Sequence, residues 1–121
     1  MHQQHDIIRR GLQELSNATQ SGQNWCVTFE ANGREHWLRC TPTHIIMDWP
    51  FSSPPAESDS LKQCFGFGGP IHIEDWGVDS HVTFTPTARD VEELIDGIAR
   101  TFRVQYGLGA GYTLTFKLEH A

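Results

Sequence analysis

Residues 25–40 read WCVTFEANGREHWLRC, and this stretch decides the fold. Apolar and polar side chains alternate on both sides of Asn32-Gly33, as they do in half-buried β-strands. Because Asn-Gly readily adopts φ > 0 at both central positions of a turn, the pair predicts a tight hairpin of residues 24–31 and 34–41. Three facing pairs are expected on its apolar side, namely Phe29 with His36, Val27 with Leu38, and Trp25 with Cys40. The other side is expected to carry Thr28, Trp37 and Arg39.

Five further segments have the composition of β-strands. They cover residues 44–49, an irregular piece over 61–70 with a glycine-rich exit, a short piece over 71–76, residues 81–84, and residues 112–118. Apolar residues occur on both faces of segment 44–49, which is typical of a central strand. Residues 50–60, PFSSPPAESDS, contain three prolines and four serines and therefore predict a loop.

Two segments have the periodicity of amphipathic helices. The first covers residues 5–19, after a frayed terminus over residues 1–4. The second begins near Thr87, which can cap it, and ends at Gly107, which suits a left-handed C-terminal cap under Leu108. Its buried stripe is expected to be Val91, Leu94, Ile95, Ile98, Phe102 and Tyr106. This order of elements predicts an α+β fold, in which one domain over residues 1–121 has a mostly antiparallel sheet of five to six strands and two helices on one face.

Charge and composition weigh against several classes of function. The formal net charge is −6. The chain of 121 residues has only nine Lys and Arg residues, and they are dispersed along it. Phosphate groups must be met by cations, so we expect no binding to nucleic acid or to an anionic membrane. No apolar run approaches the ~18 residues that a membrane span needs, and residues 1–5 are polar. An odd set of three cysteines without a CxxC pair predicts reduced thiols, and we expect a cytoplasmic protein.

Residues 64–76 are the best candidate in the sequence for a catalytic, ligand-binding or metal-binding site. Cys64 precedes the glycine-rich stretch 66–70, and His72 and Glu74 alternate on one strand face, where they can share a metal ion. The glycine stretch matches neither a dinucleotide fingerprint nor a P-loop, and Cys64 has no identifiable base. A small enzyme or a ligand- or metal-binding protein is therefore the alternative hypothesis, and we predict no cofactor.

Aromatic residues near acids predict a different function. Four tryptophans are many for so small a core, so we expect Trp37, Trp49, Trp76 and Phe51 to be exposed anchors. The acidic rim around them is expected to be Asp48, Glu74 and Asp75. Such a surface suits a protein partner that carries basic residues, and the sequence therefore predicts binding to another protein without catalysis.

From Val82 to Leu118 the chain resembles a type III secretion chaperone-like domain of small bacterial proteins. The likeness lies in the segment DVEELI at residues 90–95, the helix through Phe102, Gly107-Leu108, and the strand Tyr112–Leu118. Small acidic immunity proteins that block toxins look similar at this level. The resemblance implies binding to another protein without catalysis, often as a homodimer. Those chaperones end on a closing helix where this chain has a strand, so no functional residue is carried over.

Overall fold

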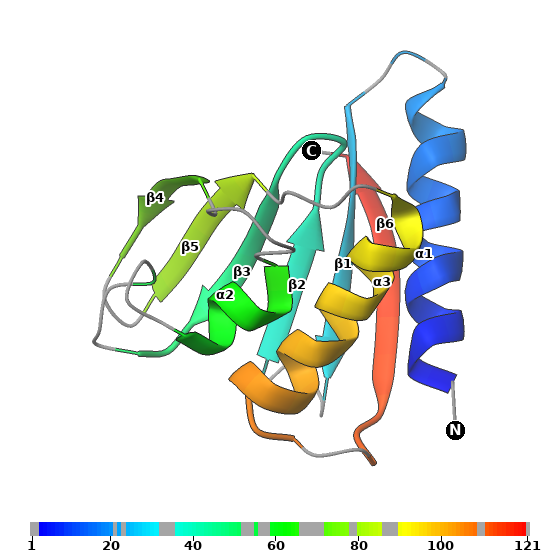
Figure 1. Ribbon diagram of the computed structural model, residues 1–121. Helices are drawn as coiled ribbons and strands as arrows, with labels where there is room; N and C mark the ends of the chain where they lie inside the picture. The colour runs from blue at the N-terminus through cyan, green and yellow to red at the C-terminus, as the bar shows by residue number, and fades with distance from the viewer. Residues whose placement is uncertain are drawn as a thin grey trace.

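In the part of the chain that the structure describes, six β-strands form one antiparallel sheet in the order β4-β5-β3-β2-β1-β6 (Figure 1). They are β1 (Trp25–Ala31), β2 (His36–Cys40), β3 (Ile45–Trp49), β4 (His72–Trp76), β5 (Ser80–Thr85) and β6 (Leu114–His120). The structure is a computed structural model that describes residues 3–20, 22, 24–31, 36–51, 55, 59–65, 72–77, 80–85, 90–108 and 111–120. The α+β fold with an antiparallel sheet is thereby confirmed, and β3 is an interior strand as expected.

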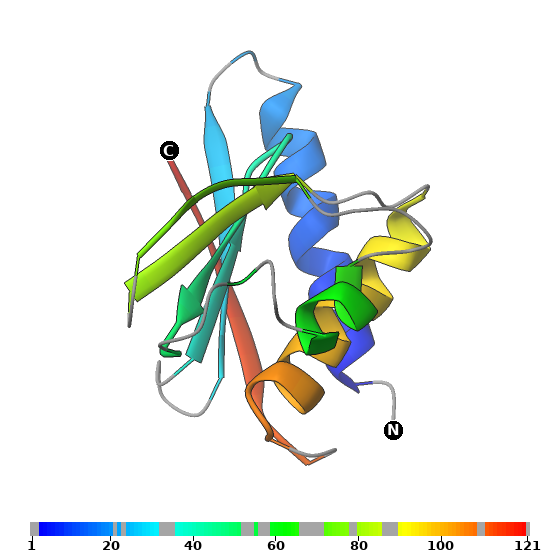
Figure 2. The same ribbon diagram turned by 60° about the vertical axis from the view of Figure 1, so that its left-hand side comes forward.

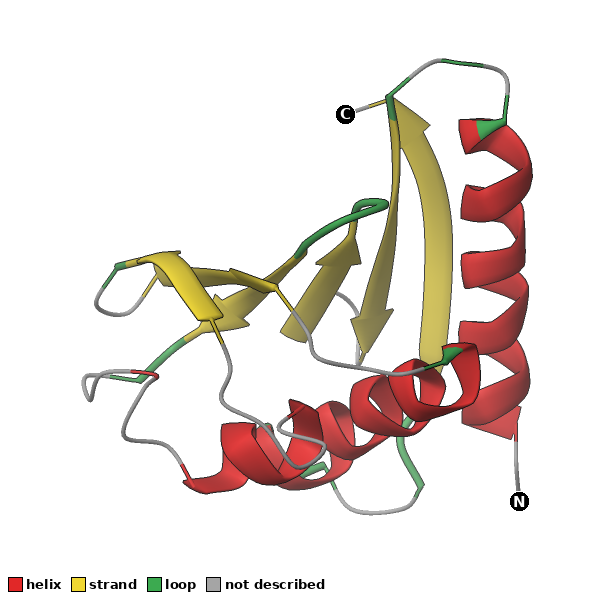
Figure 3. Ribbon diagram, turned by 45° about the horizontal axis from the view of Figure 1, so that its top comes forward, coloured by secondary structure: helices red, strands yellow, loops and turns green. Residues whose placement is uncertain are grey.

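The helices lie together on one face of this sheet (Figure 2). They are α1 (Gln3–Thr19), α2 (Asp59–Phe65) and α3 (Val91–Arg100), which continues as the π-helical turn η2 (Thr101–Gln105). Figure 3 shows α1 alongside β6, and α2 and α3 crossing below the other strands. Among the described residues no helix is both long and apolar enough to cross a membrane.

Helix α2 corrects the prediction of an irregular strand over residues 61–70. Leu61, Cys64 and Phe65 are buried at a spacing of three and four residues, which is the period of a helix packed on one side. The helix begins at Asp59, so the last two residues of the predicted loop 50–60 are helical. Pro55, within that predicted loop, is buried. Residues 66–71, with the glycine-rich exit, lie outside the described part of the chain.

Two rows of directly opposed residues form the sheet's side of the core. Residues that pair across strands share a face, so each row runs from one edge of the sheet to the other. The first row is Phe116, Phe29, Leu38, Met47, Val82 and Trp76. The second is Leu118, Val27, Cys40, Ile45, Phe84 and Ile73. The four interior members of each row are buried under the helices, whereas the members on the edge strands are partly exposed.

The hairpin has the predicted faces but not the predicted register. Phe29 pairs with Leu38 rather than His36, and Val27 pairs with Cys40 rather than Leu38. Ala31 and His36 are the last pair among the described residues, and residues 32–35 between them lie outside the described part of the chain. The register slips by two positions, which keeps every side chain on its predicted face because strands alternate with period two. Asn32 and Gly33 lie outside the described residues.

The ends of the helices differ from the sequence expectation in three places. Gln3 and Gln4 are already helical, so the prediction of a frayed terminus over residues 1–4 is wrong for these two residues. Helix α3 is capped by Asp90, whose carboxylate accepts a hydrogen bond from the Glu93 backbone N–H at 2.9 Å, and the expected cap Thr87 lies outside the described residues. Val91 is 53 % exposed rather than buried. Gly107 has φ +69°, which confirms the left-handed cap.

Candidate interaction surface

The sheet face opposite the helices carries a third row of opposed residues. It consists of Lys117, Thr28, Arg39, Ile46, Thr83 and Asp75, in order from β6 to β4. We call the face formed by this row and by Trp37, two positions before Arg39, the outer face. Figure 2 shows that α1, α2 and α3 all lie on the other side of the sheet. An antiparallel sheet with one face packed and one face free normally presents polar residues on the free face, so a tryptophan at its centre is a departure.

Arg39 and Trp37 are held in a fixed arrangement at the centre of the outer face. The guanidinium carbon of Arg39 lies 5.7 Å from the centre of the Trp37 ring, within the range of a cation–π contact. Nε of Arg39 donates a hydrogen bond to Oγ1 of Thr28 at 3.0 Å. Thr28 is only 3 % exposed, although it lies on the face opposite the helices. Arg39 thus has two contacts that fix its orientation, and it forms no ion pair with any residue in the described part of the chain.

Charges toward the two edges of the outer face are paired with one another. On β6, Nζ of Lys117 lies 3.8 Å from a carboxylate oxygen of Glu30 and 4.0 Å from one of Glu119. On β4, Oδ2 of Asp75 lies 3.1 Å from Nε2 of His81. Except for Glu30, whose side chain is 14 % exposed, these groups are open to water, so the pairs contribute little to stability.

The predicted aromatic anchors are distributed over both faces. Trp49 is fully buried and is among the largest buried side chains, so the prediction that it is an exposed anchor is wrong. The core has more room than the chain length suggested. Phe51 is half-buried and packs edge-on against Trp49, with ring centres 4.8 Å apart. Trp76 is half-buried at the end of the first core row, on the helix side. Only Trp37 of the four lies on the outer face.

Each predicted acidic residue lies beside a histidine. Oδ2 of Asp48 is 3.5 Å from Nδ1 of His36, at the outer limit of a hydrogen bond, and His36 stacks on the Tyr106 ring. Burial raises the pKa of Asp48, and His36 opposes this effect. Glu74, the extra residue of a β-bulge in β4, pairs with Nε2 of His44. The predicted acids therefore form histidine–carboxylate pairs in place of a continuous acidic rim.

The alternative site over residues 64–76 is not assembled by the described residues. Cys64 lies in α2 within the helix layer, where it is buried and where desolvation raises the pKa of its thiol. His72 and Glu74 lie on the edge strand β4, in the other layer. Among the described residues there is no group of three or more His, Cys, Asp or Glu side chains that could hold a metal ion.

A hydrogen-bonded Ser–His–Asp chain occurs on the β4–β5 ribbon and has no counterpart in the sequence analysis. Oγ of Ser80 lies 3.1 Å from Nδ1 of His81, whose Nε2 lies 3.1 Å from Oδ2 of Asp75. Ser80 and His81 are adjacent in sequence, and the side chains of His81 and Asp75 are 36 % and 69 % exposed. Water screens charges at such exposure, which removes the low-dielectric setting that makes a catalytic triad effective.

Comparison of the chain with models of protein families, with curated proteins and with solved structures found no match. Strand alternation predicts that Thr28, Trp37 and Arg39 share one face of the sheet. The contacts of Arg39 with Thr28 and Trp37 depend on the register of the strands, so the sequence does not predict them. The signal was the pattern Trp-x-Arg on a strand, which puts both side chains on one face.

Proposed function

We propose that this protein acts without catalysis, by binding another protein through the outer face of its sheet. The observation that carries this proposal is the Trp37–Arg39 pair, held in place by Thr28. Tryptophan and arginine are the residue types most enriched at the energetic centres of protein interfaces. A side chain that is already ordered loses less conformational entropy on binding, so the fixed geometry favours association.

The partner in this proposal has a surface that is basic overall. The net charge of −6 gives the protein a negative field that accelerates encounter with a basic partner. The resemblance to type III secretion chaperones and to immunity proteins supports the same class of activity, which is escort or occlusion of another protein. A cytoplasmic location is part of the proposal, and the three free, buried cysteines support a reducing compartment.

The test is capture of partners with matched variants. Wild-type protein and the Trp37→Ala and Arg39→Ala variants are immobilised, bound proteins are identified, and affinity for the purified partner is measured by calorimetry. Val104→Ala and Arg103→Ala are the controls, because both residues are exposed on the helix layer, away from the outer face. We expect the outer-face variants to bind at least about tenfold more weakly, since a hot-spot truncation costs about 2 kcal/mol or more. A partner that binds all variants alike contradicts the proposal.

A further inference from the structure

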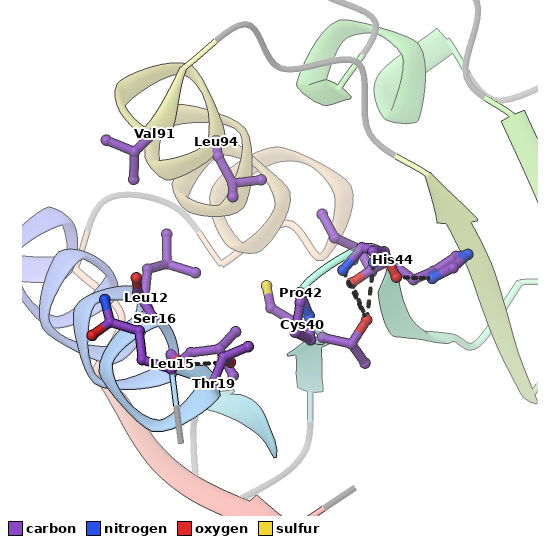
Figure 4. A pocket seen from close by; sticks show the side chains of 13 residues that line it. Leu12, Leu15, Ser16, Thr19, Cys40, Pro42, His44, Val91 and Leu94 are labelled. Carbon is purple, nitrogen blue, oxygen red and sulfur yellow. Dashed lines mark hydrogen bonds between the residues drawn. The ribbon is translucent and has the colours of Figure 1, made fainter. Parts of the chain in front are cut away.

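A cleft of about 460 Å³ opens between the helices and one end of the sheet (Figure 4). Its walls come from the C-terminal half of α1, the turn that joins β2 to β3, and the first turn of α3. It lies on the helix side of the sheet, so it is separate from the outer face, and the inference below does not depend on the proposed function.

The cleft has apolar walls. Its apolar lining residues are Leu12, Leu15, Cys40, Pro42, Ile45, Val91 and Leu94. Figure 4 shows Leu94 of α3 and Leu12 and Leu15 of α1 facing the same space as Cys40. Val91 is the residue that helical periodicity placed in the core, yet it is 53 % exposed at the edge of this cleft. The apolar stripe of α3 therefore extends beyond the core and into the cleft wall.

The hydrogen-bonding groups in the inner wall already have partners within the protein. Oγ1 of Thr19 donates to the Leu15 carbonyl at 2.7 Å. Oγ1 of Thr41 accepts from the His44 backbone N–H at 2.9 Å. The His44 ring pairs through Nδ1 with Oγ1 of Thr43 at 2.7 Å and through Nε2 with Glu74. An apolar molecule in the cleft would leave none of these groups without a partner, so it would not incur the cost of an unsatisfied buried polar atom.

The described residues that line the cleft include no Lys, Arg, Asp or Glu. An ionised group placed inside would lose hydration, and the basic side chain among these lining residues, His44, is already paired with Glu74, so the loss would be unfavourable. The volume is about three times the ~150 Å³ of an engineered apolar cavity that holds one benzene molecule. It also falls in the range of about 300–1,000 Å³ that is usual for small-molecule sites.

From these observations we propose that the cleft binds a small, uncharged, largely hydrocarbon molecule of about the size of two fused rings. Leu12, Leu15 and Leu94 form its main contacts, and Val91 closes one side. The polar residues Ser16 and Gln20 are exposed at the rim, where a single hydroxyl of the ligand can remain in water.

The probe for this proposal is 2-naphthalenemethanol, followed by amide NMR of the full chain. We expect saturable shifts at residues 12–16, 40–45 and 91–94. The carboxylate of the same ring system, 2-naphthoate, should bind at least about tenfold more weakly because its charge is not compensated. No saturable shift, shifts located elsewhere, or equal binding of the two probes would overturn the proposal.

Two matched variants separate the cleft from general surface effects. Val91→Trp should fill the cleft and weaken binding of 2-naphthalenemethanol at least about tenfold, because the indole would take the ligand's volume. Val104→Trp places the same side chain at another exposed valine, 44 % exposed and outside the cleft, and should leave binding unchanged. Undiminished binding to folded Val91→Trp would overturn the proposal. So would light scattering that shows a wild-type dimer and a Val91→Trp monomer, since a second copy of the chain would then occupy the cleft.

Discussion

Gly97 of α3 lies so close to the backbone of Cys64 in α2 that a Cβ at position 97 would meet the Cys64 carbonyl oxygen at 2.7 Å. The same Cβ would lie 2.9 Å from the ring of Phe65. Both distances are below normal van der Waals contact, and the nearest atom belongs to a backbone that cannot rotate away. The close approach of the two helices therefore requires glycine at this position.

Gly97→Ala should destabilise the protein for this reason. Overpacking costs about 1–3 kcal/mol, which exceeds the ~1 kcal/mol that alanine gains over glycine inside a helix. Thermal unfolding should show a lower Tm than wild type. Gly111→Ala is the control, because a Cβ there has no atom within 4 Å, and it should leave the Tm unchanged. A Gly97→Ala protein as stable as wild type would contradict the packing of α2 on α3.

Asp90→Ala should remove the N-terminal cap of α3. The Asp90 carboxylate accepts a hydrogen bond from the Glu93 N–H, and loss of such a cap costs about 1 kcal/mol. Asp90→Asn keeps an acceptor oxygen and should retain most of the stability. Urea unfolding of the three proteins measures the difference. Equal losses in Asp90→Asn and Asp90→Ala would mean that the charge, and not the hydrogen bond, is what stabilises the helix.

Both tyrosines should resist ionisation while the protein is folded. Burial raises the pKa of Tyr112 to about 12 from its ordinary value of 10.0, and burial also raises the pKa of Tyr106, whose hydroxyl donates to the Asp48 carbonyl at 2.6 Å. The folded state holds these protons more tightly than the unfolded state, so the stability they contribute is complete below pH 10 and is lost as the pH rises toward 12. Tyrosinate absorbance should appear together with unfolding. A titration with a midpoint near pH 10 in the folded protein would contradict this burial.

Tyr112→Phe provides the corresponding variant. Its phenol donates to the Ala99 carbonyl at 3.2 Å, so the substitution should cost about 1 kcal/mol at neutral pH. Between pH 10 and 12 the variant should lose less stability than wild type, because phenylalanine has no hydroxyl to ionise and the raised pKa of Tyr112 no longer contributes. Urea unfolding at several alkaline pH values measures both effects.

The cysteines should be unreactive in the native protein. Cys26, Cys40 and Cys64 are at most 4 % exposed, and burial raises the pKa of each thiol, that of Cys40 to about 12. The thiolate is the reactive form, so iodoacetamide should modify the folded protein at least about a hundredfold more slowly than the denatured protein. Mass spectrometry counts the adducts. Rapid modification of any cysteine in the folded state would show an accessible thiolate and reopen the case for thiol chemistry.

The faces of the strands could be predicted from the sequence because alternation is a local property. Val27, Phe29 and Leu38 point into the core as expected, and Trp37 and Arg39 point away from it. The register could not be predicted, because Asn32-Gly33 favours a two-residue turn while pairing with β3 and β6 fixes β1 and β2 from outside the hairpin.

Burial of individual aromatic residues also depends on the assembled fold. The length of the chain and its four indoles predict that Trp49 is exposed. The third helix, α2, adds Leu61 and Phe65 to the core and enlarges it. Leu61, Cys64 and Phe65 have helical spacing, but the prolines before them and the glycines after them are typical of loops and irregular strands, so the sequence does not predict this short helix.

The last strand of the chain completes the pairing of the first. Ala31 pairs with Leu114, so β1 has a vacant edge until the ribosome has added roughly 80 further residues, a delay of about 4–16 s at ordinary rates of translation. During this interval Val27 and Phe29 belong to a strand that is paired with β2 on one side and has one open edge, and such an edge can recruit other chains. Truncated products that stop before Leu114 should therefore aggregate, and the full protein should fold only after synthesis has passed β6.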